Sequence, residues 1–189
     1  MKTKLLMLLV LLGSLWTSNL YAQTRYPKRE FRGAWIQCVN GQFQGMPTEK
    51  MKKVLVSQLD NLQKAGINAI IFQVRAEADA LYKSPYEPWS RFLTGVQGKA
   101  PSPMWDPLQF MIEECHKRNM ELHAWINPYR AKTKGTGALS PMHPYSKNPE
   151  LFVQYAGQLY FDPGLPESRK YICKIVRDLS LIHISEPTR

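Results

Sequence analysis

Hydrophobic positions along the chain form short apolar runs that are separated by longer segments of mixed polarity. Runs at residues 31–39, 67–75 and 120–127 predict three strands, and the second run is almost continuously apolar with β-branched residues. Such a run is typical of a parallel strand that is covered on both faces. We therefore expect a buried parallel sheet.

Amphipathic helices are predicted between these strands. Apolar residues three and four positions apart predict a helix over residues 48–65, with Thr48 as its N-cap and Gly66 at its stop. Asp106 is placed to cap a second helix, with Pro107 at its first position and Asn119 at its end.

A third helix is predicted to open at Pro166 and to turn Ile172, Ile175 and Val176 inward. The order strand, helix, strand, helix, strand, helix implies parallel strands with right-handed crossovers. Long loops follow the strands, whereas the returns from helix to strand are short, which favours a TIM barrel. A doubly wound sheet is the alternative, but no G-x-G-x-x-G follows the first strand.

The fold class that we predict is α/β, namely the N-terminal three β/α units of a truncated (β/α)8 TIM barrel. A complete barrel needs about 250 residues, and this chain has 189. We assign the partial barrel to residues 23–178. No pattern of a fourth strand follows the third helix.

Both ends of the chain are set apart from this domain. Residues 1–22 have two lysines, an apolar run and a polar stretch that ends in Ala22, which predicts a cleavable signal peptide and a secreted or periplasmic protein. The apolar run is short for a membrane span, so we expect no integral span in the mature chain. Residues 179–189, "LSLIHISEPTR", match the translation of a common sequencing adapter, and we interpret them as an adapter-derived artefact. A natural tail is the alternative.

Charge and cysteine content add two constraints. The net charge of +10 suits anionic polymers, although simple solubility explains it as well. No run of Lys and Arg resembles a nucleic-acid patch, so no nucleic-acid partner is expected. The three cysteines are too sparse for a disulfide framework, and we place Cys115 and Cys173 in the core. No spacing suggests a metal site, and no cofactor is predicted.

Polar and aromatic residues cluster at the predicted strand ends, as a sugar-binding site requires. Trp89 and Trp125 are candidate platforms for sugar rings, with packing as the alternative role. His123, Trp125 and Asn127 alternate along one strand and so share a face, although a core role for His123 is an equally simple interpretation. Arg75 either binds an anionic group or braces the structure through Asp79 or Glu77.

Glycoside hydrolysis usually needs two carboxylates. The candidates in the loops are Glu77, Asp79 and Asp162, and their spacing marks no pair. A serine nucleophile is not indicated, because no G-x-S-x-G occurs.

Several stretches together resemble the glycosyl hydrolase-like 10 family. They are "FRGAWI", "GINAIIFQVR", "ADALYKSPYEPWSRFLTG", "DPLQFMIEECHKRNMELHAWINPYR" and "YFDPGLPESRKYI". The resemblance implies a TIM barrel of bacterial envelope or secreted proteins that hydrolyses glycosidic bonds, with a peptidoglycan-type glycan as substrate.

The resemblance also implies roles for individual residues. An acidic "DG-x-x-x-DD"-like motif, which looks catalytic in the family, would follow beyond Asp178, so we expect this chain alone to be inactive. A non-catalytic glycan-binding envelope protein is the alternative. The matched positions, together with Trp125 and Asp162, are predicted to shape the substrate cleft: Arg75, Asp79, Tyr82, Trp89, His123, Trp125, Asn127, Tyr129, Arg130 and Asp162.

Overall fold

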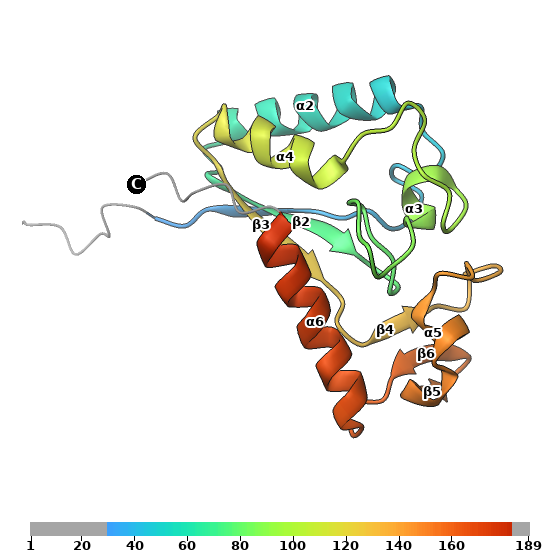
Figure 1. Cartoon of the computed structure of the whole chain (residues 1–189). Coiled ribbons are helices and arrows are strands. Elements are labelled where there is room, and N and C mark those ends of the chain that lie inside the picture. The colour runs from blue at the N-terminus through green and yellow to red at the C-terminus, as the bar shows by residue number, and fades with distance from the viewer. Residues whose placement is uncertain (1–29, 183–189) are drawn as a thin grey trace, which may run out of the picture. The chain divides into compact units, whose positions relative to one another are not determined.

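The computed structural model describes residues 30–182 of the chain (Figure 1). Every helix and strand described lies within the unit Arg32–Arg189. The predicted signal peptide at residues 1–22 and most of the predicted tail at residues 179–189 lie outside the described residues. None of the described helices is long and apolar enough to cross a membrane.

Three parallel strands form the first sheet, in the order β1 (Gly33–Ile36), β2 (Ala69–Arg75) and β3 (Glu121–Ile126). All three predicted strands are confirmed, and each is shorter than its apolar run. The predicted burial of the first strand is wrong, because in β1 only Ile36 is buried and Trp35 is 66% exposed.

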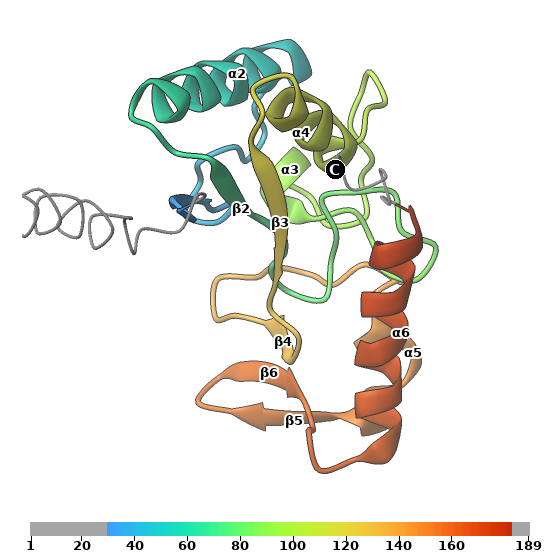
Figure 2. The same ribbon diagram turned by 90° about the vertical axis from the view of Figure 1, so that its left-hand side faces the viewer.

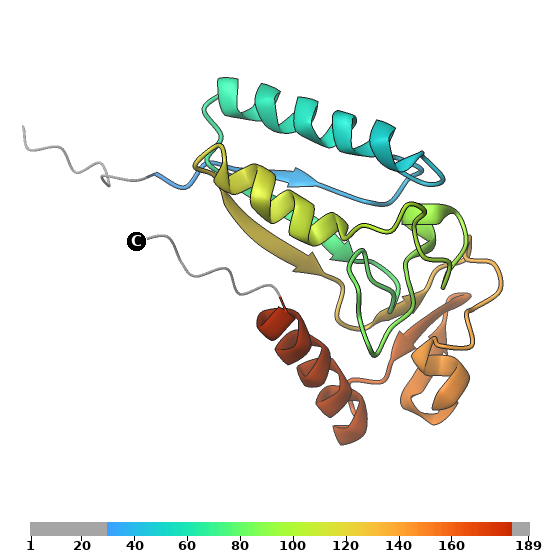
Figure 3. The same cartoon turned by 45° about the horizontal axis from the view of Figure 1, so that its top comes forward.

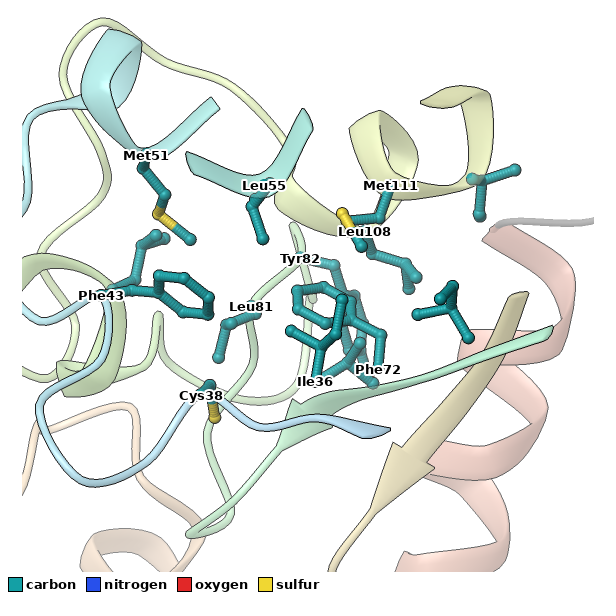
Figure 4. Close-up of a cluster of buried hydrophobic side chains, with 14 of the residues drawn as sticks. Ile36, Cys38, Phe43, Met51, Leu55, Phe72, Leu81, Tyr82, Leu108 and Met111 are labelled. Atoms are coloured by element: carbon teal, nitrogen blue, oxygen red, sulfur yellow. The ribbon is translucent and has the colours of Figure 1, made fainter. Parts of the chain in front are cut away.

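Two helices connect these strands and cover one face of the sheet, α2 (Thr48–Lys64) and α4 (Pro107–His116) (Figure 3). Side chains from both helices and from the sheet form one apolar cluster (Figure 4). Its members include Ile36, Met51, Leu55, Phe72, Leu108 and Met111. Complete burial of a leucine or phenylalanine side chain stabilises the fold by about 1.5–3 kcal/mol, so this cluster is the main source of stability of the parallel sheet.

Local signals set the ends of these helices largely as predicted. The Asp106 carboxylate accepts hydrogen bonds from the main-chain N–H groups of Leu108 and Gln109, and thereby caps α4. Gly66 and Asn119, with φ of 81° and 54°, end the two helices in the left-handed conformation. The predicted cap by Thr48 is wrong, because Pro47 holds the N-cap position of α2 and no side chain caps it.

The third predicted helix is present as α6 (Pro166–Ile182). Ile172 and Ile175 are buried, as predicted, but Val176 is 45% exposed. The prediction for the cysteines is right for Cys115, which is buried, and wrong for Cys173, which is exposed. Cys173 lies one position after Ile172 on α6, which turns it towards solvent.

The segment between β3 and α6, interpreted from the sequence as a loop, contains a second sheet. It is antiparallel with the order β4 (Arg130–Lys132), β6 (Gln158–Phe161) and β5 (Phe152–Tyr155). Two short helical turns, α5 (Pro144–Lys147) and η1 (Pro149–Leu151), lie in the same segment, and α3 (Arg91–Thr94) lies in the loop after β2. The chain is therefore a mixed α/β protein with a parallel three-stranded sheet and a separate antiparallel three-stranded sheet.

Candidate functional site

Charged side chains at the end of β2 are buried and paired with one another. The guanidinium of Arg75 forms a two-point ion pair with Glu87, with Nε–Oε2 at 2.7 Å and Nη2–Oε1 at 2.6 Å, and both side chains are 0% exposed. Its Nη1 group donates to the main-chain carbonyls of Asn127 and Pro128. Arg75 therefore braces the ends of β2 and β3. Of the two predicted roles the structure shows the brace, but with Glu87 as partner instead of Asp79 or Glu77.

Glu77 links the loop that follows β2 with the loop that follows β4. Its carboxylate accepts hydrogen bonds from the Arg91 guanidinium, with Nε–Oε2 at 2.9 Å, and from the hydroxyls of Thr133 and Thr136. Burial alone would raise the pKa of Glu77, but these donors together lower the pKa below its ordinary value. Glu77 is therefore ionised at pH 7, and both of its carboxylate oxygens accept hydrogen bonds from protein groups.

Asp79 is a second buried carboxylate next to Glu77. It accepts a hydrogen bond from the Glu77 N–H at 3.1 Å and one from the Gln97 side-chain amide at 3.4 Å. Gln97 in turn accepts from the Ser140 N–H at 3.0 Å, which extends the network into the second loop. Burial, and next the charge of Glu77, raise the pKa of Asp79 to about 6.

His143 belongs to the same network, although no pattern in the sequence marked it as a candidate. It is fully buried, and its Nε2 lies 3.2 Å from the Glu77 carbonyl oxygen and 3.1 Å from that of Ala131. Its Nδ1 accepts a hydrogen bond from the Tyr145 N–H. Burial lowers the pKa of His143, so the ring is neutral at pH 7 and donates through Nε2.

A different set of side chains lies on the exposed face of the parallel sheet, opposite α2 and α4. We call Trp35, His123, Trp125 and Asn127 the tryptophan face. The rings of Trp35 and Trp125 meet edge to face with centroids 4.8 Å apart. Trp125 donates through Nε1 to the Asn127 side-chain oxygen at 3.1 Å, and the Asn127 amide donates to the Ala76 carbonyl at 3.2 Å. The two side chains are thereby fixed at the end of β3.

The shared strand face of His123, Trp125 and Asn127 is confirmed. The His123 side chain is 47% exposed and contacts Glu121, so it does not lie in the core. Trp35 was missed in the sequence, because its run was interpreted as buried. Its position between Ala34 and Ile36, both of which turn towards the core, was the signal that placed it on the opposite face.

The remaining predicted binding residues do not converge on this face. Arg75, Asp79 and Tyr82 are buried, with Tyr82 in the apolar core, and this differs from the accessible positions expected of them. Trp89 is partly buried against the same core.

Three of the predicted residues lie beyond the end of β3. Tyr129 packs in a second apolar cluster below the antiparallel sheet. Arg130 is exposed on β4, and Asp162 closes its own turn by accepting from the Gly164 N–H at 2.8 Å. Across the described part of the chain, no group of three or more His, Cys, Asp or Glu side chains is arranged to hold a metal ion.

Comparison with known proteins connects this geometry to a family. The model of the family described as "Glycosyl hydrolase-like 10" matches residues 30–181. The glycosyl hydrolase YngK of Bacillus subtilis (strain 168) is 44% identical over 170 residues, which cover 84% of this chain and 33% of that protein. The glycosyl hydrolase DigH of Escherichia coli (strain K12) is 32% identical over 179 residues, which cover 84% of this chain and 40% of that protein.

Among solved structures, a noncanonic maltogenic alpha-amylase, AmyB of Thermotoga neapolitana, aligns with a TM-score of 0.52. The alignment covers 80% of this chain and 36% of the amylase at 16% identity, so it concerns the fold alone. The family match spans almost all described residues, and it agrees with the resemblance seen in the sequence. The chain belongs to the glycosyl hydrolase-like 10 family.

Proposed function

We propose that this chain is the N-terminal part of an exported glycoside hydrolase that acts on a bacterial cell-wall glycan or a related polysaccharide. Family membership supports the reaction class, and two relatives of which the chain spans 33% and 40% carry the name glycosyl hydrolase. Export rests on the leader-like sequence of residues 1–22.

The observation that carries this proposal is the tryptophan face. Flat aromatic rings pack against the faces of sugar rings, and fixed amide and imidazole groups bind hydroxyls. Trp125 and Asn127 are held in place by their mutual hydrogen bond at 3.1 Å, whereas Trp35 and His123 remain exposed. A sugar chain placed at the end of β3 would meet the Trp125 ring and the Asn127 amide in positions that their hydrogen bond already fixes.

We place this face inside a TIM barrel. β1, β2 and β3 are adjacent in chain order, parallel, and covered by α2 and α4 on one side, as successive units of a barrel are. The uncovered side would then face the barrel interior, which side chains fill, and Trp125 and Asn127 at the carboxyl end of β3 would reach the substrate.

The catalytic carboxylates are proposed to lie outside the described residues. Glu77, Asp79 and Glu87 follow β2, but all three are at most 2% exposed and each is hydrogen-bonded to protein groups. Hydrolysis requires carboxyl groups that reach the glycosidic oxygen and the anomeric carbon. We therefore expect the chain alone to bind glycan and not to cleave it.

The test is hydrolysis by a longer protein from the same gene that includes this chain. Incubation with peptide-free peptidoglycan strands should release reducing ends, and Trp125→Ala should lower the rate at subsaturating substrate at least tenfold. Met104→Ala is the matched control, since Met104 is 63% exposed in the loop after β2. Absence of reducing ends with this substrate and with a panel of other polysaccharides would refute the enzymatic proposal.

A second candidate is a non-catalytic glycan-binding protein that uses the same face. The observation in its favour is that the carboxylates following β2 are buried and hydrogen-bonded to other groups of the protein. It predicts saturable binding that Trp125→Ala weakens, without turnover in the longer protein.

A further inference from the structure

The antiparallel sheet has one face that packs against the rest of the chain and one face that does not. Its register pairs Phe152 with Phe161 and Val153 with Tyr160, so the members of each pair share a face. Phe161 and Leu159 are 0% and 8% exposed and belong to the second apolar cluster, which identifies the inner face.

The opposite face, which we call the outer face, displays aromatic and polar groups. It is formed by Arg130, Val153, Tyr155, Gln158 and Tyr160. Val153 is 42% exposed and Tyr155 is 74% exposed. These side chains contribute little to the core, because the cluster beneath the sheet is built from the inner face.

The turn at the tip of the outer face has a defined backbone conformation. The β5–β6 turn consists of Ala156 and Gly157, with φ of 50° and 74°, as a two-residue turn of type I′ requires. A Cβ at Gly157 would lie 3.2 Å from Cε of Lys134, so the Lys134 stem packs closely against this turn. Beside the turn, the Tyr160 hydroxyl donates to the Gln158 side-chain oxygen at 3.0 Å. A ligand would therefore meet a surface that is already ordered.

The charge of the outer face is positive. Arg130 is exposed and lies opposite Tyr160 in the β4–β6 register, and none of the five side chains is acidic. A guanidinium next to a phenol ring offers two-point binding of a carboxylate beside a flat apolar surface. That combination fits a sugar ring that bears an acidic substituent.

We propose that the outer face binds a second stretch of an acidic glycan, with sugar rings against Tyr155 and Tyr160 and a carboxylate at Arg130. The ligand class rests on the proposed function. Arg130 follows Asn127 of the tryptophan face by three positions, and the Tyr129 carbonyl accepts a hydrogen bond from the Phe161 N–H at 2.8 Å. Figure 2 shows β4 leading directly from the end of β3, with β6 and β5 beyond it. One polymer chain could thus contact both faces, which raises its affinity through effective concentration.

The experiment is a binding titration of the full chain with two probes. They are peptide-free peptidoglycan strands and the same strands with their carboxyl groups reduced to alcohols. Tyr155→Ala should weaken binding of both probes at least fivefold, and Tyr155→Phe should restore it, since the ring and not the hydroxyl makes the contact. Arg130→Gln should weaken binding of the acidic strands at least fivefold and leave binding of the reduced strands within twofold.

Controls separate this inference from the proposed function. Met104→Ala should bind both probes like the unaltered chain, and circular dichroism should show that every variant is folded. Unchanged affinity in Tyr155→Ala and Arg130→Gln would overturn the outer-face site, as would equal losses for both probes in Arg130→Gln. Neither result would affect hydrolysis by the longer protein, which is the readout of the proposed function. No binding of either probe by the unaltered chain would also overturn the outer-face site.

Discussion

Two arginines, one at the end of β2 and one on β4, show how burial separates structural charges from charges that can bind a ligand. Arg75 is 0% exposed, and its guanidinium donates hydrogen bonds to Glu87 and to two main-chain carbonyls after β3. Arg130 is exposed and stands on a sheet face that has no part in the core. Both were among the residues predicted to shape the substrate cleft, with a structural brace as the alternative for Arg75, and the structure distinguishes their surroundings. Position relative to the core, and not residue type, decides the role.

The largest expected effect is the loss of the buried ion pair. Arg75→Gln leaves the Glu87 carboxylate buried without a counter-charge, so the free energy of unfolding should fall by about 3–5 kcal/mol. Urea denaturation followed by circular dichroism measures this change. Arg130→Gln is the matched control and should lie within about 0.5 kcal/mol of the unaltered chain. A loss below about 1 kcal/mol in Arg75→Gln would show that the brace is not structural.

The second prediction concerns pH and Asp79. The pKa of this carboxyl is about 6 in the folded chain against an ordinary 3.8, so the folded chain binds the proton more tightly than the unfolded chain. Its contribution to stability is therefore fully present below about pH 4 and is lost as the pH rises to 6, by up to about 3 kcal/mol.

The variant Asp79→Asn removes this titration. Its free energy of unfolding, relative to the unaltered chain, should rise between pH 4 and 6 and level off above about pH 7. Denaturation of both proteins at several pH values measures this difference. Glu77 and His143, whose lowered pKa values make stability rise with pH, contribute about equally to both proteins and so cancel in the difference. A difference that does not vary with pH would contradict the burial of an ionisable Asp79.

A smaller effect is expected at the link between the two loops. Thr136→Val removes one of the donors to the Glu77 carboxylate, whereas Arg91 and Thr133 remain. Loss of a hydrogen bond to a charged acceptor should cost about 1.5 kcal/mol. The double variant Thr136→Val with Glu77→Gln tests this assignment, since the threonine should matter less once the carboxylate is neutral. Additive losses in a double-mutant cycle would be the opposing result.

The smallest effect is expected on the outer face. Tyr155 is 74% exposed, so Tyr155→Ala should change the free energy of unfolding by less than about 0.5 kcal/mol. Thermal denaturation of the chain with and without the substitution checks this. A loss of 2 kcal/mol or more would mean that Tyr155 stabilises the hairpin, and the outer face would then have a structural role like that of the buried charge pairs.

The parallel part of the fold could be predicted because its signals are local. Apolar runs placed the three strands, and Asp106, Gly66 and Asn119 marked helix ends through preferences of individual residues. The common face of Trp125 and Asn127 followed from the period of a strand.

The antiparallel sheet and the charge pairs could not be predicted in the same way. Strands β4, β5 and β6 have three or four residues, too few for a period to emerge, and Ala156 is not a typical residue for its turn. Arg75 pairs with Glu87, which lies twelve positions later in an irregular loop, and no helix or strand periodicity relates two such positions. The two strands of the hairpin, FVQY and QLYF, have two aromatic residues each, and this is too little to mark a hairpin without a typical turn between them.

The most direct measurement is a paired comparison of Arg75→Gln and Arg130→Gln, in which unfolding free energy and affinity for acidic glycan strands are determined on the same preparations. The account predicts that Arg75→Gln lowers stability by about 3–5 kcal/mol, and that Arg130→Gln lowers affinity at least fivefold with stability unchanged. The opposite pattern, with stability lost in Arg130→Gln or affinity lost in a fully stable Arg75→Gln, would contradict the division between structural and binding charges.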